Sequence, residues 1–448
     1  MDFAIFLYHS YMQEKVKINN NEEAMAIAIE KTFKSVLGSS LTTIAGFLAL
    51  CSMKLSLGKD IGLVMAKGVL FGLICVVTLL PSMILQFNNI IEKTKHKEIL
   101  PKFTHIRDFV IKHYKIIALI FIIILPIVFY GYKNTGIYYN LDKSLPTSLE
   151  SISANNELQD KFNMVSVEMV LLDKNMPDYK VNEMLNEIEK IDGIEWTIAY
   201  SKIANNGIPK EVLPDELVSV FQSEKHQMLL INSKYEIATD ELNDQVTKVN
   251  DVIKRYDKNA ILAGEGPLMK DLVEISDHDF NSVNTVSIVV IFIIMIFVLK
   301  SILLPVVLIA VIEFAIFVNM GIPYYTNTIL PFVASIVIGT IQLGATIDYA
   351  ILITNKYIVG RKTGKDKKEA ISEALGTSIG SIIISGLTFF GATFGVGVYS
   401  KIEMIGSLCT LMSRGAIVSM VCVITVLPTF LMIFDKIICK TTIGMKNS

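Results

Sequence analysis

Long apolar runs, separated by short charged segments, dominate the pattern of this chain. About 20 apolar residues in a helix cross the hydrocarbon core of a bilayer. The runs therefore predict eight membrane-spanning helices, which are Val36–Met53, Val64–Gln86, Ile116–Tyr130, Val283–Leu299, Leu303–Met320, Ile329–Ile353, Ile379–Val398 and Ile405–Phe434. Met1–Tyr11 is predicted to be the inner half of a ninth helix.

The segment Lys133–Ser282 has a different pattern, with short strand-like runs and amphipathic stretches among polar residues. The order strand, helix, strand occurs twice, in Val165–Leu172, Asp178–Ile191, Trp196–Tyr200, Gln227–Asn232, Thr239–Tyr256 and Ala260–Leu262. This order predicts one α+β domain with an antiparallel or mixed sheet. Pro267–Asn281 is expected to couple that domain to the next span.

Lysine and arginine residues predict the orientation, since they are enriched in cytoplasmic loops. They form four groups that the alternating spans place on one side: Lys15, Lys17, Lys31 and Lys34; Lys93, Lys95, Lys97, Lys102, Arg107, Lys112 and Lys115; Arg361, Lys362, Lys365, Lys367 and Lys368; Lys436, Lys440 and Lys446. We therefore expect a partial first transmembrane half at 1–132, an extracytoplasmic domain at 133–282, a second transmembrane half at 283–435 and a cytoplasmic tail at 436–448.

The composition agrees with a polytopic membrane protein, because 52% of the residues are hydrophobic and the mean hydropathy is +0.51. The net charge of -2 and the placement of the basic loops give no reason to expect nucleic acid as a partner. The five cysteines lie in or beside apolar segments without disulfide or metal-ligand spacing, so they are interpreted as packing residues. No cleavable signal peptide is evident at the first residues.

Enzyme motifs are absent from the sequence. No glycine loop with a lysine is present to bind phosphates, so ATP is not the expected energy source. The six histidines form no metal-ligand set, and no cofactor is expected. His278, between Asp277 and Asp279, is interpreted as part of a solvated surface cluster.

The two ends of the chain repeat one another. Asp2-Phe3-Ala4-Ile5 returns as Asp348-Tyr349-Ala350-Ile351, and further matches include Leu41-Thr42 with Leu387-Thr388 and, after a one-residue slip, Gly68 with Gly415 and Pro81 with Pro428. Each copy carries one acid inside an apolar run. Duplicated halves that meet at intramembrane polar groups are typical of transporters.

Asp348 is the principal candidate for chemistry, because apolar residues surround it in sequence on both sides. An ionised aspartate at the bilayer centre costs about 3 kcal/mol on insertion scales, which favours the protonated form. A carboxyl group that exchanges its proton inside a membrane is a proton switch. The alternative is a structural role, in which Asp348 is hydrogen-bonded to a neighbouring helix.

Other polar or small residues could assist Asp348. Ser385 and Thr388 on the following predicted helix could bond to Asp348 or carry a relay, and Thr42 matches Thr388 in the repeat. Gly339 and Gly344 flatten the helix of Asp348 for close packing. Glu313 is a second intramembrane acid, expected to line a water-filled path or lie near the outer interface. Lys67 and Arg414 are interpreted as snorkelling anchors.

These features together resemble the resistance-nodulation-division (RND) superfamily, and within it the MMPL family of lipid and hydrophobic-compound exporters. The motifs are the Asp348-Tyr349 pair, the Tyr357–Arg361 stretch, Glu369-Ala370, Gly386-Leu387-Thr388 and the Arg414-Gly415 to Leu427-Pro428 ending. The resemblance implies a polytopic α-helical membrane protein with RND/MMPL-like transmembrane repeats and one extracytoplasmic α+β (ferredoxin-like βαβ) domain between the halves. It also implies a proton relay through Asp348, Tyr349 and Asp2.

The expected function is proton-motive-force-driven export of lipids or hydrophobic small molecules across the plasma membrane, with protons and membrane lipids as partners and no enzymatic activity. The alternatives are a non-transporting accessory protein, related to sterol sensing or protein export, and a non-functional fragment. Phe3 stands where the family pattern has tyrosine. The family typically has twelve spans, and this chain begins partway through the fourth, so it is expected to be inactive alone. The alternatives are a truncated gene, a start assigned at an internal methionine and one half of a split system. The expected protein partner is a missing N-terminal half or a second copy of this chain.

Overall fold

The structure is a computed structural model that describes residues 2–18, 20–94, 103–139, 145, 148–205 and 214–445. The predicted basic loop residues Lys95, Lys97, Lys102 and Lys446 lie outside the described residues. The chain forms two compact units. The first comprises Met1–Ile137, His278–Ser400 and Met404–Ser448, and the second comprises Tyr138–Asp277 and Lys401–Glu403.

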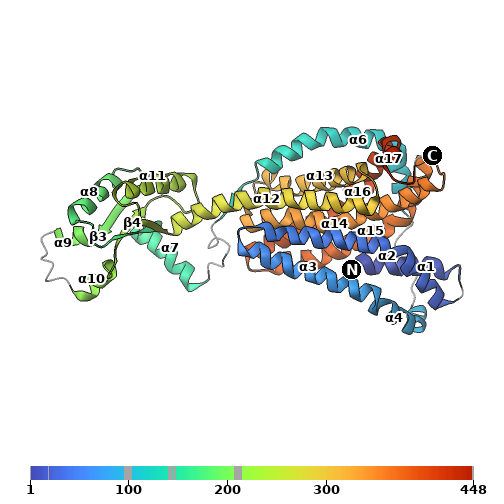
Figure 1. Cartoon of the computed structure of the whole chain (residues 1–448), viewed down its shortest axis with the longest axis horizontal. Coiled ribbons are helices and arrows are strands. Elements are labelled where there is room, and N and C mark those ends of the chain that lie inside the picture. The colour runs from blue at the N-terminus through green and yellow to red at the C-terminus, as the bar shows by residue number, and fades with distance from the viewer. Residues whose placement is uncertain are drawn as a thin grey trace. The chain divides into compact units, whose positions relative to one another are not determined.

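The first unit is a helical bundle (Figure 1). In the described residues, eight helical segments are long and apolar enough to cross a membrane, which confirms the predicted number of spans. They are α2 (Asn21–Ala49) with the short helix Leu50–Ser52, α3 (Ser56–Val77) with α4 (Leu79–Gln86), α6 (Thr104–Lys133), α12 (Glu265–Leu299), α13 (Leu303–Tyr325), α14 (Phe332–Lys362), α15 (Lys367–Tyr399) and α16 (Glu403–Ile433). Shorter helices are α1 (Asp2–Lys15), α5 (Asn88–Lys93) and α17 (Asp435–Thr441).

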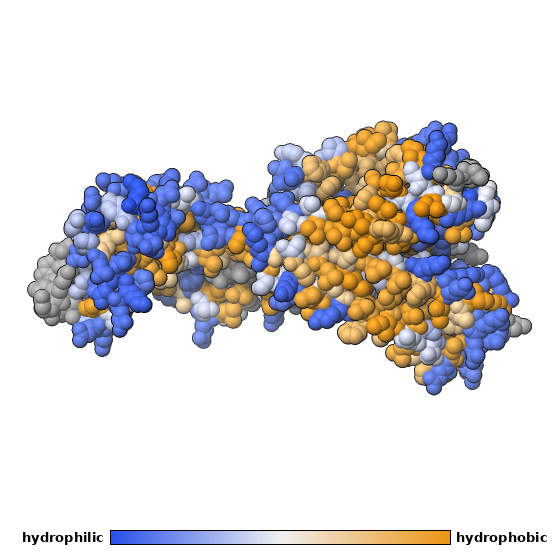
Figure 2. All heavy atoms as spheres, viewed as in Figure 1, coloured by the Kyte–Doolittle hydropathy of each residue, from blue (hydrophilic) through white to orange (hydrophobic). Residues whose placement is uncertain are grey.

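The helices of the bundle differ in how far they are enclosed by protein. In their most apolar windows, 83% of α14 is buried, against 6% of the α3–α4 segment and 11% of α6. Helix α14 packs against α2, α13 and α15. Apolar side chains cover much of the visible flank of the bundle (Figure 2), as expected for a surface that contacts lipid. Helix α14 is therefore the central element on which the neighbouring helices pack.

Small residues allow α6 and α13 to approach closely. A Cβ atom added at Gly321 would lie 2.8 Å from the carbonyl oxygen of Val128, and one added at Gly131 would lie 2.9 Å from the carbonyl oxygen of Gly321. The Tyr325 hydroxyl donates to the carbonyl of Ile127 at 2.6 Å beside this crossing. Packing through small residues is a main source of helix association in membranes.

A buried ion pair fixes one end of the bundle. Arg361 at the end of α14 donates to both carboxylate oxygens of Asp435 in α17, at 2.9 and 3.2 Å. The Tyr357 hydroxyl also donates to Asp435. We name this end the basic end, because it carries Arg361 together with Lys15, Lys31 and Lys367.

The interpretation of Asp279 as part of a solvated cluster is wrong. Asp279 is fully buried, and its two carboxylate oxygens accept hydrogen bonds from the backbone N–H groups of Lys54 and Leu55, at 2.9 and 3.0 Å. These N–H groups precede α3, whose first turn leaves backbone donors without helical partners. Asp279 therefore joins α12 to the start of α3, whereas His278 is exposed as predicted.

The second unit contains a four-stranded antiparallel sheet in the order β3-β4-β2-β5. Its strands are β2 (Ser166–Asp173), β3 (Ile194–Ala199), β4 (His226–Ser233) and β5 (Ile261–Gly264), with α8 (Asp178–Ile188) and α11 (Asp240–Tyr256) between them. These six elements confirm the strands and helices predicted from periodicity. The remaining elements are α7 (Glu150–Phe162), α9 (Tyr200–Asn205) and α10 (Asp215–Phe221) in this unit, and the short strands β1 (Ile137–Tyr138) and β6 (Leu330–Pro331).

Glu168 is a buried acid on the core face of this sheet. Strand β2 alternates buried and exposed residues, and Glu168 occupies a buried position between Ser166 and Val170. Among the described residues, neither carboxylate oxygen of Glu168 has a hydrogen-bond partner. Desolvation by burial raises the pKa of Glu168 from 4.5 to about 7.

We predict that Glu168 makes the stability of this unit pH-dependent. Between pH 4.5 and 7 the folded chain holds a proton on Glu168 that the unfolded chain releases. The free energy of unfolding should therefore fall by about 3 kcal/mol as the pH rises through this window, and stay level above it. Trp196 in β3 is the only tryptophan of the sequence, so its fluorescence during urea unfolding of the whole chain measures this unit.

In that experiment, Glu168→Gln should remove this fall, whereas Glu195→Gln, at an exposed position of β3, should keep it. Equal pH profiles for the wild type and Glu168→Gln would show that burial does not hold a proton on this residue.

We also predict that Asp435→Asn destabilises the bundle by about 3 kcal/mol, because it leaves the Arg361 guanidinium buried without a countercharge. Lys365→Met, which removes the more exposed pair of Lys365 with Glu373, should cost about 1 kcal/mol or less. Thermal unfolding of the detergent-solubilised chain, followed by size-exclusion chromatography, compares the two variants. A smaller effect of Asp435→Asn than of Lys365→Met would refute a structural role for the buried pair.

Candidate functional site

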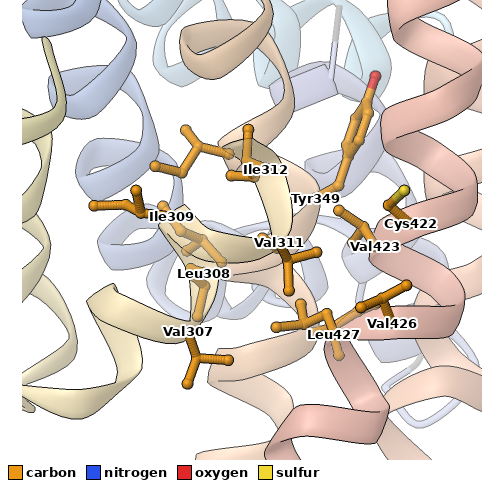
Figure 3. Packing of buried hydrophobic residues seen from close by; sticks show 14 of the residues in the cluster. Val307, Leu308, Ile309, Val311, Ile312, Tyr349, Cys422, Val423, Val426 and Leu427 are labelled. Carbon is orange, nitrogen blue, oxygen red and sulfur yellow. The ribbon is translucent and has the colours of Figure 1, made fainter. Parts of the chain in front are cut away.

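The central helix α14 holds Asp348 and Tyr349, the Asp-Tyr pair of the second repeat, inside the bundle. Asp348 is 5% exposed and Tyr349 is 1% exposed. The Tyr349 ring belongs to a core cluster with Val311 and Ile312 of α13 and with Val423 of α16 (Figure 3). The prediction of an acid enclosed within an apolar helix is confirmed, and its environment excludes bulk water from most of the carboxyl group.

The hydroxyl groups predicted to lie near this pair donate to different kinds of acceptor. The Ser385 hydroxyl on α15 donates to the Tyr349 hydroxyl at 3.3 Å, so these two residues are brought together. The Thr388 hydroxyl donates at 2.7 Å to the carbonyl of Ile384, in its own helix. In the other copy of the repeat, the Thr42 hydroxyl likewise donates within α2, to the carbonyl of Ser39 at 2.7 Å.

Thr43 makes the contact between the two repeats that the sequence analysis missed. Its hydroxyl lies 2.8 Å from the carbonyl oxygen of Gly344 in α14 and 3.0 Å from that of Ser39. The site of a Cβ at Gly46 is 3.7 Å from the Cα of Gly344, so the two helices touch through backbone atoms here. At Gly339 an added Cβ would meet only Asn284, in ordinary contact at 3.7 Å. The close approach predicted from glycines is therefore centred on Gly344.

A buried polar network lies along α14 on the side of Asp348 away from the basic end. The Asn319 side-chain amide donates to the Gln342 side-chain oxygen at 2.8 Å, and the Gln342 amide donates to the Ser419 hydroxyl at 2.9 Å. Arg414 donates at 2.8 Å to the side-chain oxygen of Asn319 and at 2.7 Å to its carbonyl. Arg414 is thus bonded inside the bundle, and its interpretation as a snorkelling anchor is wrong.

Three polar positions of α14 lie on one stripe of the helix. Gln342, Tyr349 and Lys356 are spaced by seven residues, which places them on the same face and spreads them over about 21 Å of helix. The Lys356 ammonium donates to the carbonyl of Thr377 in α15 at 2.9 Å. This length is a large part of the hydrocarbon thickness of a bilayer, about 30 Å. Gln342 and Lys356 were not predicted from the sequence, although their seven-residue spacing from Tyr349 is a usable signal.

Two further predicted residues lie apart from this stripe. Glu313 is on α13, and its Oε1 is enclosed with no hydrogen-bond partner among the described residues. The side chain of Asp2, at the start of α1, lies outside the described residues. Within the ranges that the structure describes, no group of three histidine, cysteine or acidic residues could hold a metal ion.

We predict that Gly415→Ala destabilises the bundle by about 2 kcal/mol. The added Cβ would lie 2.7 Å from both the Asn319 amide nitrogen and the Gln342 oxygen, which forces their hydrogen bond apart. Gly391→Ala in α15 is the matched control, because its Cβ would meet nothing within 4 Å. Thermal unfolding in detergent measures both variants, and equal midpoints would contradict the tight packing at Gly415.

Comparison with known proteins agrees with this architecture. The model of the MMPL family matches residues 1–103 and 166–440. The chain is similar to a membrane protein of Methanocaldococcus jannaschii, MJ1562, with 36% identity over 84 residues, which are 19% of this chain and 22% of the relative. It is also similar to membrane protein ActII-3 of Streptomyces coelicolor, with 34% identity over 86 residues, 19% of this chain and 12% of the relative.

A third relative is named "Probable transport protein MmpL1", from Mycobacterium tuberculosis, with 22% identity over 182 residues. That match covers 40% of this chain and 19% of the relative. The chain thus matches about a fifth or less of the length of each of the three relatives. Because the family model matches most of the residues, and the bundle carries the expected spans and the Asp348-Tyr349 pair, the chain belongs to the MMPL family.

Proposed function

We propose that this chain takes part in proton-motive-force-driven export of lipids or hydrophobic small molecules across the plasma membrane. The observation that carries the proposal is the enclosure of the Asp348 carboxyl group on α14, the most enclosed helix of the bundle. A carboxyl group in such a place exchanges between a neutral and a charged form at a cost that depends on its surroundings. Two arrangements of the helices that differ in this cost bind the proton with different affinity, so protonation shifts their populations.

The energy available from protons is sufficient for such a shift. One elementary charge that crosses the whole membrane field gains about 2.3 kcal/mol per 100 mV. Each unit of pH difference adds about 1.4 kcal/mol. Tyr349 and Ser385, joined by their hydroxyl groups, extend the site from α14 to α15 and are proposed to relay the proton. Asp2, Thr42 and Thr388 are proposed as further relay residues, and Glu313 as an intramembrane polar group beside the path.

Other observations support the remaining parts of the proposal. The name of the Mycobacterium tuberculosis relative supports transport. The strand order β3-β4-β2-β5, with α8 and α11 on the connections, supports a ferredoxin-like arrangement for the second unit, which is proposed to lie outside the cell and guide substrate. The distribution of lysines and arginines supports a cytoplasmic location for the basic end.

We predict that Asp348→Asn lowers transport about a hundredfold, because asparagine keeps the size of the side chain but cannot take up a proton. The measurement is proton-gradient-driven movement of a fluorescent lipid by the full-length gene product in vesicles. Asp60→Asn, at an exposed position of α3, is the control and should transport normally. Full transport by Asp348→Asn would refute the proposed proton coupling.

A further inference from the structure

A pocket of about 570 Å³ opens at the basic end of the bundle, between α1, α2, α14 and α15. It is lined by residues from both copies of the repeat. On α14 the first lining residue is Leu352, one turn beyond Asp348 toward the basic end. Nothing in the roles assigned above uses this pocket. Its volume is within the range of small-molecule binding sites.

The lining of the pocket changes from apolar to polar along the helices. The apolar residues Phe6, Val36 and Leu352 lie about one helical turn nearer the middle of the bundle than Ser10, Thr32 and Lys356, which line the same pocket. The charged residues of the lining are therefore nearer the basic end than Phe6, Val36 and Leu352, which lie at the deeper end. Such a gradient fits an amphiphile that has one polar and one apolar part.

Three lysines and two glutamates line the pocket, and Lys356 is the lysine that forms no ion pair with the described residues. Lys31 pairs with Glu14 at 2.9 Å, and Lys365 pairs with Glu373. Hydrogen bonds from Lys31 and Lys17 lower the pKa of Glu14, so the Glu14 carboxylate stays charged beside these two ammonium groups. Lys356 has no carboxylate within 4.0 Å among the described residues, and the carbonyl of Thr377 accepts only one of its three N–H bonds.

Neutral donors complete the surroundings of Lys356. The Asn355 amide donates one N–H to the Ser35 hydroxyl oxygen at 3.0 Å, which leaves its second N–H and the Ser35 O–H to bond to a ligand. An ammonium, an amide and a hydroxyl that face one pocket are donors suited to the oxygens of a phosphate.

We propose that this pocket binds a phosphate-bearing amphiphile from the adjoining leaflet of the membrane. The phosphate contacts Lys356, Asn355 and Ser35, and the acyl chain lies along Phe6, Val36 and Leu352. The inference deepens the proposed function. It rests on that function, because it assumes that the protein carries an amphiphile. It places the bound headgroup about 12 Å from Asp348 along α14, the separation between residues 348 and 356.

The test measures binding without any proton gradient. The full chain is placed in nanodiscs of phosphatidylcholine that contain a small fraction of phosphatidic acid with a photoreactive diazirine in its acyl chain. Crosslinked peptides are then mapped by mass spectrometry. We expect labelling of the peptides that contain Phe6, Val36 or Leu352, and a loss of about tenfold in Lys356→Met, which removes a charge-assisted hydrogen bond.

Two variants serve as controls. Lys356→Arg keeps the charge and should keep the labelling, which assigns the loss to the missing charge, and an unchanged thermal unfolding midpoint of Lys356→Met excludes misfolding. Lys362→Met removes a lysine from an exposed position of the same helix, outside the pocket, and should also label normally. A matched phosphatidylcholine probe should label these peptides weakly.

Three outcomes would overturn the inference: no labelling at the pocket, equal labelling by both probes, or unchanged labelling in Lys356→Met. Displacement of the phosphatidic acid probe by millimolar inorganic phosphate would assign the pocket to a soluble anion and would also overturn it. Because labelling needs no gradient, it separates this inference from the proposed function. Full transport by Asp348→Asn with lysine-dependent labelling would refute the proton coupling and leave the binding site.

Discussion

A membrane interior offers no water to polar groups, and this constraint explains the arrangement of the bundle. Each polar group within the hydrocarbon region must find its partner inside the protein. Helix α14 carries Gln342, Asp348, Tyr349 and Lys356, so it needs neighbours on nearly all sides, and 83% of its most apolar window is buried. The most apolar window of α6 carries few such groups, and its apolar side chains are exposed, as expected of a surface that contacts lipid. The position of each helix thus follows from the polar residues that it must shield.

Patterns that extend over many residues were predictable from the sequence. Apolar length alone identified the eight spans, because crossing the bilayer requires a minimum number of residues. Alternation identified β2 and β4, since one face of each strand meets the core. The internal repeat singled out Asp348, and its enclosure follows from the cost of exposing an acid to hydrocarbon.

Contacts that depend on rotation about a helix axis were not predictable. The repeat matched Thr42 with Thr388, yet both of these hydroxyls bond within their own helices, and the hydroxyl that bonds to the other repeat belongs to Thr43. Successive residues on a helix are rotated by about 100°, so a shift of one residue changes the neighbour. The role of a charged residue is equally hard to predict from its position in the sequence, because Arg414 at a predicted span start is bonded to Asn319 within the bundle. Only the packing of the helices distinguishes an anchoring arginine from one in a buried network.

The bond from Thr43 to Gly344 has a mechanical consequence. In an α-helix, the carbonyl of residue 344 is the acceptor for the backbone N–H of residue 348. Thr43 therefore contacts the peptide group that closes the helical turn of Asp348. Sliding of α2 along α14 must either break this contact or strain that turn, and a change at the turn acts back on α2 in the same way. A single hydroxyl group thus couples the movement of α2 in one repeat to the helical turn of the acid in the other.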